Sequence, residues 1–146
     1  YGLTNRAGSA SFKFVSAATL TVGWVAVLIG VLVTGAGPHS GDAESVRNGL
    51  DLETWQHYHS YPAYMTLALA VAGLIAVLRR DGGFGSSRQA LVSWLLFISL
   101  AIQAVIGVIQ SRLGVPPLLV GIHLFGASTI ISLLHLQWLF AFGKDR

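Results

Sequence analysis

Charged residues divide the chain into four long uncharged runs. Asp, Glu, Lys and Arg are absent between Lys13 and Asp42, between Glu53 and Arg79, between Arg88 and Arg112, and between Arg112 and Lys144. Each run exceeds the roughly 20 residues that a helix needs to cross a hydrocarbon core of about 30 Å. Periodicity alone does not separate buried helices from buried strands, but runs of this length favour helices. The pattern predicts four transmembrane helices, over about 14–35, 54–79, 89–111 and 116–143.

Turn-forming residues support these boundaries. Pro116 and Pro117 suit the first turn of the fourth helix, where a missing N–H costs nothing. Glycine and proline end the first helix at Gly37-Pro38, and Asp81-Gly82-Gly83 forms a turn after the second. We therefore expect an all-α integral membrane protein, with a single four-helix transmembrane domain over residues 1–146.

The composition excludes several other classes of protein. Hydrophobic residues make up 53% of the chain and charged residues only 10%, whereas a soluble domain carries about 25% charged residues. The absence of cysteine excludes disulfides, iron–sulfur clusters and thiolate zinc sites. The net charge is +3, but no basic face exists to follow a nucleic-acid backbone. The expected surroundings are membrane lipid, and no nucleic-acid partner is expected.

Lysine and arginine are distributed unevenly between the two ends of the predicted bundle. One end holds Arg6, Lys13, Arg79, Arg80, Arg88, Lys144 and Arg146, and the other holds only Arg47 and Arg112. Because basic residues collect on the cytoplasmic side of membrane proteins, both termini are expected to be cytoplasmic. The prediction is a multi-pass protein of the cell membrane with N-in and C-in topology.

The depth of the histidines in the membrane distinguishes one pair from the others. Ionisable groups inside a membrane are functional candidates by default. His59 precedes Arg79 by 20 residues, and His123 precedes Lys144 by 21. At 1.5 Å per residue, the two histidines share one level to within about a turn, on helices that run the same way. They could face each other across a flat ligand such as a haem, whereas His135 lies too deep to join them.

Helical phase then separates His57 from His59. Two positions correspond to about 200° of rotation, so only one of these side chains can point into the bundle. Small residues follow the two paired histidines on the same helix faces: Ala63, Thr66 and Ala70 after His59, and Gly126 and Ala127 after His123. Small residues permit close helix contact in membranes, or they leave room for a planar macrocycle. His57 instead shares its phase with Tyr61 and Tyr64.

The residues alone leave other roles open for each histidine. His39 and His57 suit hydrogen bonds to headgroups or a loop, and His135 suits packing and a bond to a neighbouring helix. For His59 and His123, ligation and packing are balanced alternatives. Imidazole is a favoured axial ligand of haem iron. Zinc is less suitable, because two histidines without a carboxylate or thiolate fall short of four ligands.

Three segments of the sequence resemble haem A synthase. They are VTGAGPHSGD, GLDLETWQHYH and LLVGIHLFGAS, and the chain resembles most closely the second half of an actinobacterial-type member. Members of that family are usually eight-helix proteins made of two four-helix halves. They oxidise a methyl group of haem O to the formyl group of haem A for cytochrome oxidase assembly.

The resemblance implies a cofactor site within this chain. The second half of such proteins holds a haem b through one histidine on its second helix and one on its fourth, which here are His59 and His123. Substrate haem O would belong to a companion four-helix half, where a carboxylate close to a histidine takes part in the chemistry. The sequence departs from the full pattern in having four helices, no acid one turn from either histidine, and no cysteine pair.

The leading hypothesis is therefore the haem-b half of a haem A synthase, an oxidoreductase, with bis-histidine iron for electron transfer and no catalytic residue of its own. It would be part of a longer enzyme, or a half-sized form that pairs with another unit. A homo-oligomer, haem O synthase and oxidase-assembly proteins are expected partners. Arg47 and Arg112 are candidates for pairing with haem propionates. The alternatives are a membrane b-type cytochrome that carries electrons without modifying haem, and a haem-free structural subunit.

Overall fold

The computed structural model describes residues 8–38, 46–83 and 86–143, and the regular elements within them are four helices joined by short connections. The helices are α1 (Ala10–Ala36), α2 (Leu52–Asp81), α3 (Arg88–Arg112) and α4 (Pro117–Phe142). The four predicted helices are confirmed. The largest difference from the predicted boundaries is at the start of α1, which begins at Ala10 and not at Phe14.

Short polar side chains start three of the helices. Ser9, Asp51 and Ser87 each accept a hydrogen bond from the backbone N–H three residues later, as N-cap residues do. Helix α4 has a proline at its first position, where no N–H is needed. Gly82 ends α2 with a φ of 80°, a left-handed conformation that glycine adopts without a steric penalty.

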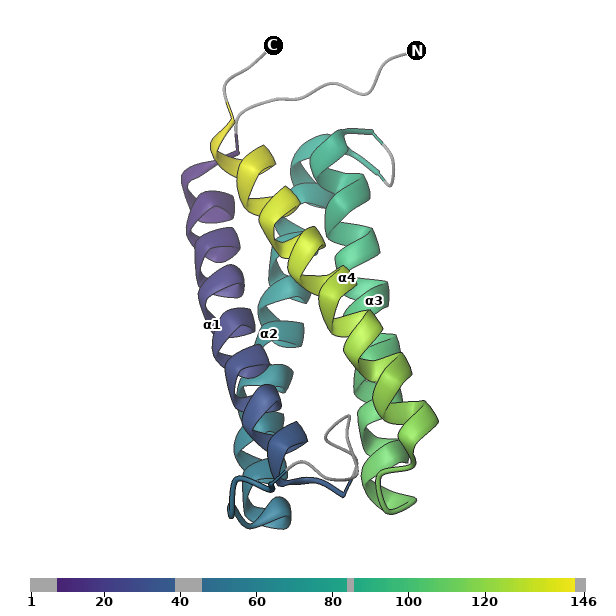
Figure 1. Cartoon of the computed structure of the whole chain (residues 1–146). Coiled ribbons are helices and arrows are strands. Elements are labelled where there is room, and N and C mark those ends of the chain that lie inside the picture. Colours follow the sequence, from purple (N-terminus) through teal and green to yellow (C-terminus); the bar gives the residue numbers. More distant parts are fainter. Residues whose placement is uncertain (1–7, 39–45, 84–85, 144–146) are drawn as a thin grey trace.

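The helices form a four-membered bundle of two hairpins. Helix α1 packs against α2 and α4, and α3 packs against α2 and α4, so that α2 and α4 lie diagonally opposite each other. Figure 1 shows the α1–α2 hairpin beside the α3–α4 hairpin, with α4 crossing the bundle at a marked tilt. The diagonal placement of α2 and α4 matters for the site, because these helices carry the paired histidines.

The hydrophobic core lies towards one end of the bundle. One cluster contains Ala70, Leu96, Leu100, Ile130 and Leu134, and a second contains Phe12, Val77, Ala90 and Ala141. The second cluster lies where α1 and α3 begin and α2 and α4 end, which we call the Arg80 end. At the opposite end, called the histidine end, no described helical residue beyond Ala26 and Gln103, or before Thr66 and Ile130, is fully buried.

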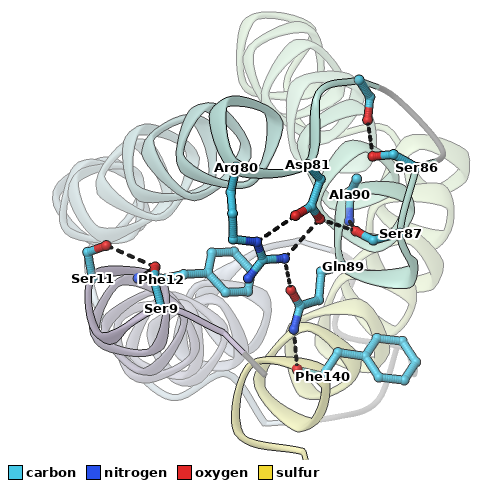
Figure 2. A network of polar contacts seen from close by, with 11 residues as sticks. Ser9, Ser11, Phe12, Arg80, Asp81, Ser86, Ser87, Gln89, Ala90 and Phe140 are labelled. Atoms are coloured by element: carbon cyan, nitrogen blue, oxygen red, sulfur yellow. Dashed lines mark hydrogen bonds and ion pairs between the residues drawn. The ribbon is translucent and has the colours of Figure 1, made fainter. Parts of the chain in front are cut away.

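A polar network closes the Arg80 end (Figure 2). Arg80 forms an ion pair with Asp81 at 2.5 Å and also donates to the side chain of the fully buried Gln89. Asp81 accepts from the hydroxyl of Ser87, and Gln89 donates to the main-chain oxygen of Phe140. These bonds connect the end of α2 to the start of α3 and the end of α4.

The outer surface of the bundle suits a membrane. All four helices are long and apolar enough to cross one. Large apolar side chains such as Phe14, Leu118 and Phe125 are each about three-quarters exposed (74%, 75% and 77%), as expected for residues that face lipid. The prediction of a four-helix membrane bundle is confirmed, and the N-in and C-in orientation remains a prediction from charge.

Candidate functional site

The structure brings His59 and His123 together at the histidine end. Their ring centroids are 6.3 Å apart, and the ring planes are inclined by 74°. Both residues are half-buried, and they project from the diagonal helices α2 and α4. The predicted pairing of these two side chains at one depth agrees with this arrangement. Their role as metal ligands remains a prediction.

Helix α1 holds the His59 ring in one orientation. Its Nδ1 lies 2.8 Å from the main-chain oxygen of Ala26. Because a carbonyl oxygen only accepts, Nδ1 must carry the hydrogen, and in the neutral ring Nε2 keeps its lone pair. One turn further along α1, Gly30 lies against the same ring: a Cβ at Gly30 would be 3.0 Å from His59 Cε1. The helix thus supports the tautomer and the position that a ligating histidine needs.

Helix α3 contacts His123 in a comparable way, at its main chain and at its ring. Gln103 Nε2 donates to the main-chain oxygen of His123 at 2.7 Å. A Cβ at Gly107 would be 3.3 Å from His123 Cε1, so the absence of a side chain there gives the ring its place. In contrast to His59, the Nδ1 of His123 is buried without a hydrogen-bond partner.

Two glutamines of α3 were missed by the sequence analysis. Gln103 and Gln110 both carry a buried Oε1 with no hydrogen-bond partner. They lie on the same helix as Gly107, in a stretch that is otherwise almost entirely apolar. Two glutamines seven positions apart in a transmembrane helix are a sequence signal for a polar function on one face.

His57 and His135 do not join the pair. His57 is exposed, as are Tyr61 and Tyr64, with which it shares its helical phase. His135 bonds through Nδ1 to Ile131 of its own helix at 2.8 Å, and its ring meets Trp24 of α1 edge-on at 5.9 Å. Its expected packing role agrees with that contact, but its hydrogen bond stays within its own helix and does not reach a neighbouring one. His39 lies outside the described residues.

The described part of the loop between α1 and α2 is tied to the end of α1. Arg47 donates to the main-chain oxygen of Pro38 at 2.6 Å, and Asn48 Nδ2 donates to that of Leu32 at 2.8 Å. Arg112, the last residue of α3, is exposed. Both arginines lie at the histidine end, as expected, and their pairing with propionates remains a prediction. The stretch 39–45 of the VTGAGPHSGD motif lies outside the described residues.

The donor set favours a metal that needs only two protein ligands. Among the described residues, no group of three or more His, Cys, Asp or Glu side chains is placed to hold a metal ion. Zinc sites use three or four protein ligands, whereas haem iron takes only its axial ligands from the protein. With nitrogen–metal bonds of about 2 Å, and roughly 1 Å from nitrogen to ring centre, two axial imidazoles have centroids about 6 Å apart. The spacing of His59 and His123 fits that requirement.

Comparison with known proteins gives one informative similarity. Over 86 residues, which are 59% of this chain, the sequence is 33% identical to a haem A synthase of Sinorhizobium fredii. The aligned part spans only 23% of that relative's length. No protein-family model matches the chain, and no solved structure matches it. The chain is thus a four-helix membrane protein with sequence similarity to part of a haem A synthase.

Proposed function

We propose that this chain is the haem-b-binding half of a haem A synthase, with His59 and His123 as the two axial ligands of the iron. The observation that carries the proposal is the 6.3 Å spacing of the two rings on diagonal helices. The similarity to a haem A synthase supports the choice of haem over other planar cofactors.

The residues around the two rings suit ligation. The main-chain oxygen of Ala26 holds the Nδ1 hydrogen of His59, which leaves Nε2 as the donor atom. Gly30 and Gly107 let the rings lie directly against α1 and α3. At this end of the bundle no described helical residue is fully buried, and large apolar side chains are exposed. A planar macrocycle bound there would remove apolar surface from contact with its surroundings.

The chain's own task would be to bind and orient the cofactor. A haem with two histidine ligands has both axial positions filled, so it supplies electron transfer and not oxygen binding. His59 and His123 would fix its depth in the membrane, and the apolar helix faces would exclude water from it. Arg47 and Arg112, at the same end, are candidates to bind its propionates.

The experiment is an absorption spectrum of the protein purified in detergent from haem-replete cells, recorded as reduced minus oxidised. We expect a low-spin b-type spectrum in the unchanged chain. His59→Ala and His123→Ala should each lose it or convert it to high spin, because each removes one of two ligands. A low-spin spectrum that persists in both variants would overturn the assignment.

Matched controls are available within the chain. His57→Ala lies two positions from His59 on an exposed face, and His135→Ala lies on the same helix as His123. Both should retain the full spectrum. Loss of haem in these two variants, with haem retained in His59→Ala and His123→Ala, would reassign the ligands to His57 and His135.

A second candidate is a membrane b-type cytochrome that carries electrons without modifying haem. It is favoured by the placement of the described acids, because the resemblance implies a carboxylate close to a histidine for the oxidation of haem O. Asp51 and Glu53 are exposed at the start of α2, and Asp81 is bound to Arg80 at the opposite end. Conversion of haem O by a longer protein or complex containing this chain, and its loss in His59→Ala, would support the first candidate. A haem-replete complex that leaves haem O unchanged would favour the second.

A further inference from the structure

We propose that Gln110 is a positioning residue for His123, accepting the Nδ1 hydrogen of that ring through its buried Oε1, while Gln103 fixes the His123 main chain. The inference rests on the proposed function, because it assigns His123 Nε2 to the metal. It adds a hydrogen-bond partner that sets the orientation of the ring and its strength as a ligand.

The three relevant residues of α3 share one face of the helix. At about 100° per residue, Gln103 and Gly107 differ by about 40° around the axis, and Gly107 and Gln110 by about 60°. Gly107 is the point of contact with the His123 ring, since a Cβ there would lie 3.3 Å from Cε1 and 4.0 Å from Nδ1. Gln110 therefore lies on the face that meets the ring, within one turn of the contact.

The direction of side chains in helices brings Gln110 and the ring closer. Side chains lean towards the N-terminus of their own helix. In α4 this lean carries the His123 ring towards the histidine end, past the level of its own Cα. In the antiparallel α3 it carries the Gln110 carboxamide the opposite way, from near the helix end back towards Gly107. The two polar groups thus converge from the two helices.

The same lean assigns a different role to Gln103. Its side chain points away from the ring, towards Gly126 and the main-chain oxygen of His123, to which it donates. Its Nε2 is already used in that bond. Gln103 therefore holds the backbone that carries His123, and Gln110 is the glutamine aimed at the ring.

The unpartnered atoms at this site are complementary. His123 Nδ1 and Gln110 Oε1 are both buried without a hydrogen-bond partner. An unpaired buried polar group is destabilising, and a histidine bound to a metal through Nε2 carries a hydrogen on Nδ1 that needs an acceptor. Gln110 Oε1 is an acceptor and has no donor. A hydrogen bond between these two atoms would satisfy both groups.

The two ligands would then differ in the kind of group that accepts their Nδ1 hydrogen. His59 donates to a main-chain oxygen, which no substitution of a side chain removes. His123 would donate to a side chain, so its ligand strength can be changed by mutation. A stronger acceptor increases the electron donation of the imidazole and favours the oxidised iron.

The test is the midpoint potential of the bound haem in the full chain, with Gln110→Leu and Gln110→Glu compared with the unchanged protein. We expect Gln110→Leu to shift the potential upwards, because the acceptor is lost, and Gln110→Glu to shift it downwards, because the acceptor is stronger. Gln110→Asn, which keeps a carboxamide, should raise the potential less than Gln110→Leu does. A purely structural role for Gln110 would not produce shifts of opposite sign.

The matched control is Gln137→Leu. Gln137, fourteen residues after His123 in α4, is also buried with an unpartnered Oε1, and its Nε2 donates to Ser93. It should lower stability and leave the potential unchanged. An unchanged haem potential in Gln110→Leu and in Gln110→Glu would overturn this inference, while the assignment of His59 and His123 as ligands would stand. Absence of haem from the unchanged protein would instead overturn the proposed function, and this inference with it.

Discussion

The two ends of the bundle differ in how their buried polar groups are hydrogen-bonded. At the Arg80 end, Arg80, Asp81 and Gln89 satisfy one another and the main chain of α4. At the histidine end, His123 Nδ1 and the Oε1 atoms of Gln103 and Gln110 are buried without partners. Unpartnered buried atoms also occur nearer the Arg80 end, at Ser16 Oγ and Gln137 Oε1, whereas at the histidine end one of them is a ring nitrogen of the paired histidines. The comparison separates the part of the molecule that holds the fold from the part that suits a ligand.

The largest expected effect tests the Arg80 end. Asp81→Ala removes the partner of Arg80 and the acceptor of Ser87, and leaving a largely buried charge unpaired costs about 3 kcal/mol. The variant should denature at a clearly lower temperature or denaturant concentration, measured by circular dichroism in detergent. Its haem spectrum in the folded state should be unchanged. A normal stability together with lost haem would reverse the roles assigned to the two ends.

A smaller effect is expected from filling the contact between α1 and His59. Gly30→Val places atoms where the ring now lies, and overpacking of this kind costs about 1–3 kcal/mol. The amount of haem bound per protein should fall, measured by absorbance after purification. Gly121→Val is the control at the same end, because a Cβ at Gly121 meets nothing within 4 Å. Equal haem loss in both variants would show that the effect is not specific to His59.

The smallest expected effect concerns Asp51, the N-cap residue of α2 at the histidine end. Hydrogen bonds from the side chain and the backbone of Thr54 hold the pKa of the Asp51 carboxyl below its usual range. A lowered pKa means that the ionised cap stabilises the first turn of α2 above the unfolded pKa, and that this is lost as the pH falls through the folded value. Protection of the Thr54 amide from hydrogen exchange, corrected for intrinsic rates, should decrease at acid pH.

Asp51→Asn is the matched control for that measurement. Asparagine can still cap the helix but does not titrate in this range. The acid-dependent loss of protection at Thr54 should therefore disappear in the variant. The same pH dependence in Asp51→Asn would contradict the assignment to Asp51.

The sequence predicted the features that depend on one helix at a time. The four spans followed from the spacing of charges, and the pairing of His59 with His123 followed from depth and phase. Both arguments use only the regular rise and rotation of a helix. The start of α4 at a proline and the end of α2 at a glycine were predicted from local backbone chemistry, which also concerns one helix at a time.

The features that the sequence analysis missed depend on contacts between helices. Arg80 was counted as a charge on one side of a membrane, but it lies in a network that reaches Phe140, sixty positions later. Gln103 has no distinctive spacing to His123, and only the antiparallel packing of α3 on α4 brings its side chain to the main chain of His123. The edge-on contact of His135 with Trp24 of α1 also depends on packing between helices.

The contacts of the two rings have a consequence for assembly in the membrane. His59 is held by α1, its partner in the first hairpin, and His123 by α3, its partner in the second. Each hairpin thus supplies one ring together with the helix that contacts it. The two rings meet only across the interface between the hairpins, so any ligand between them would bind both hairpins at once.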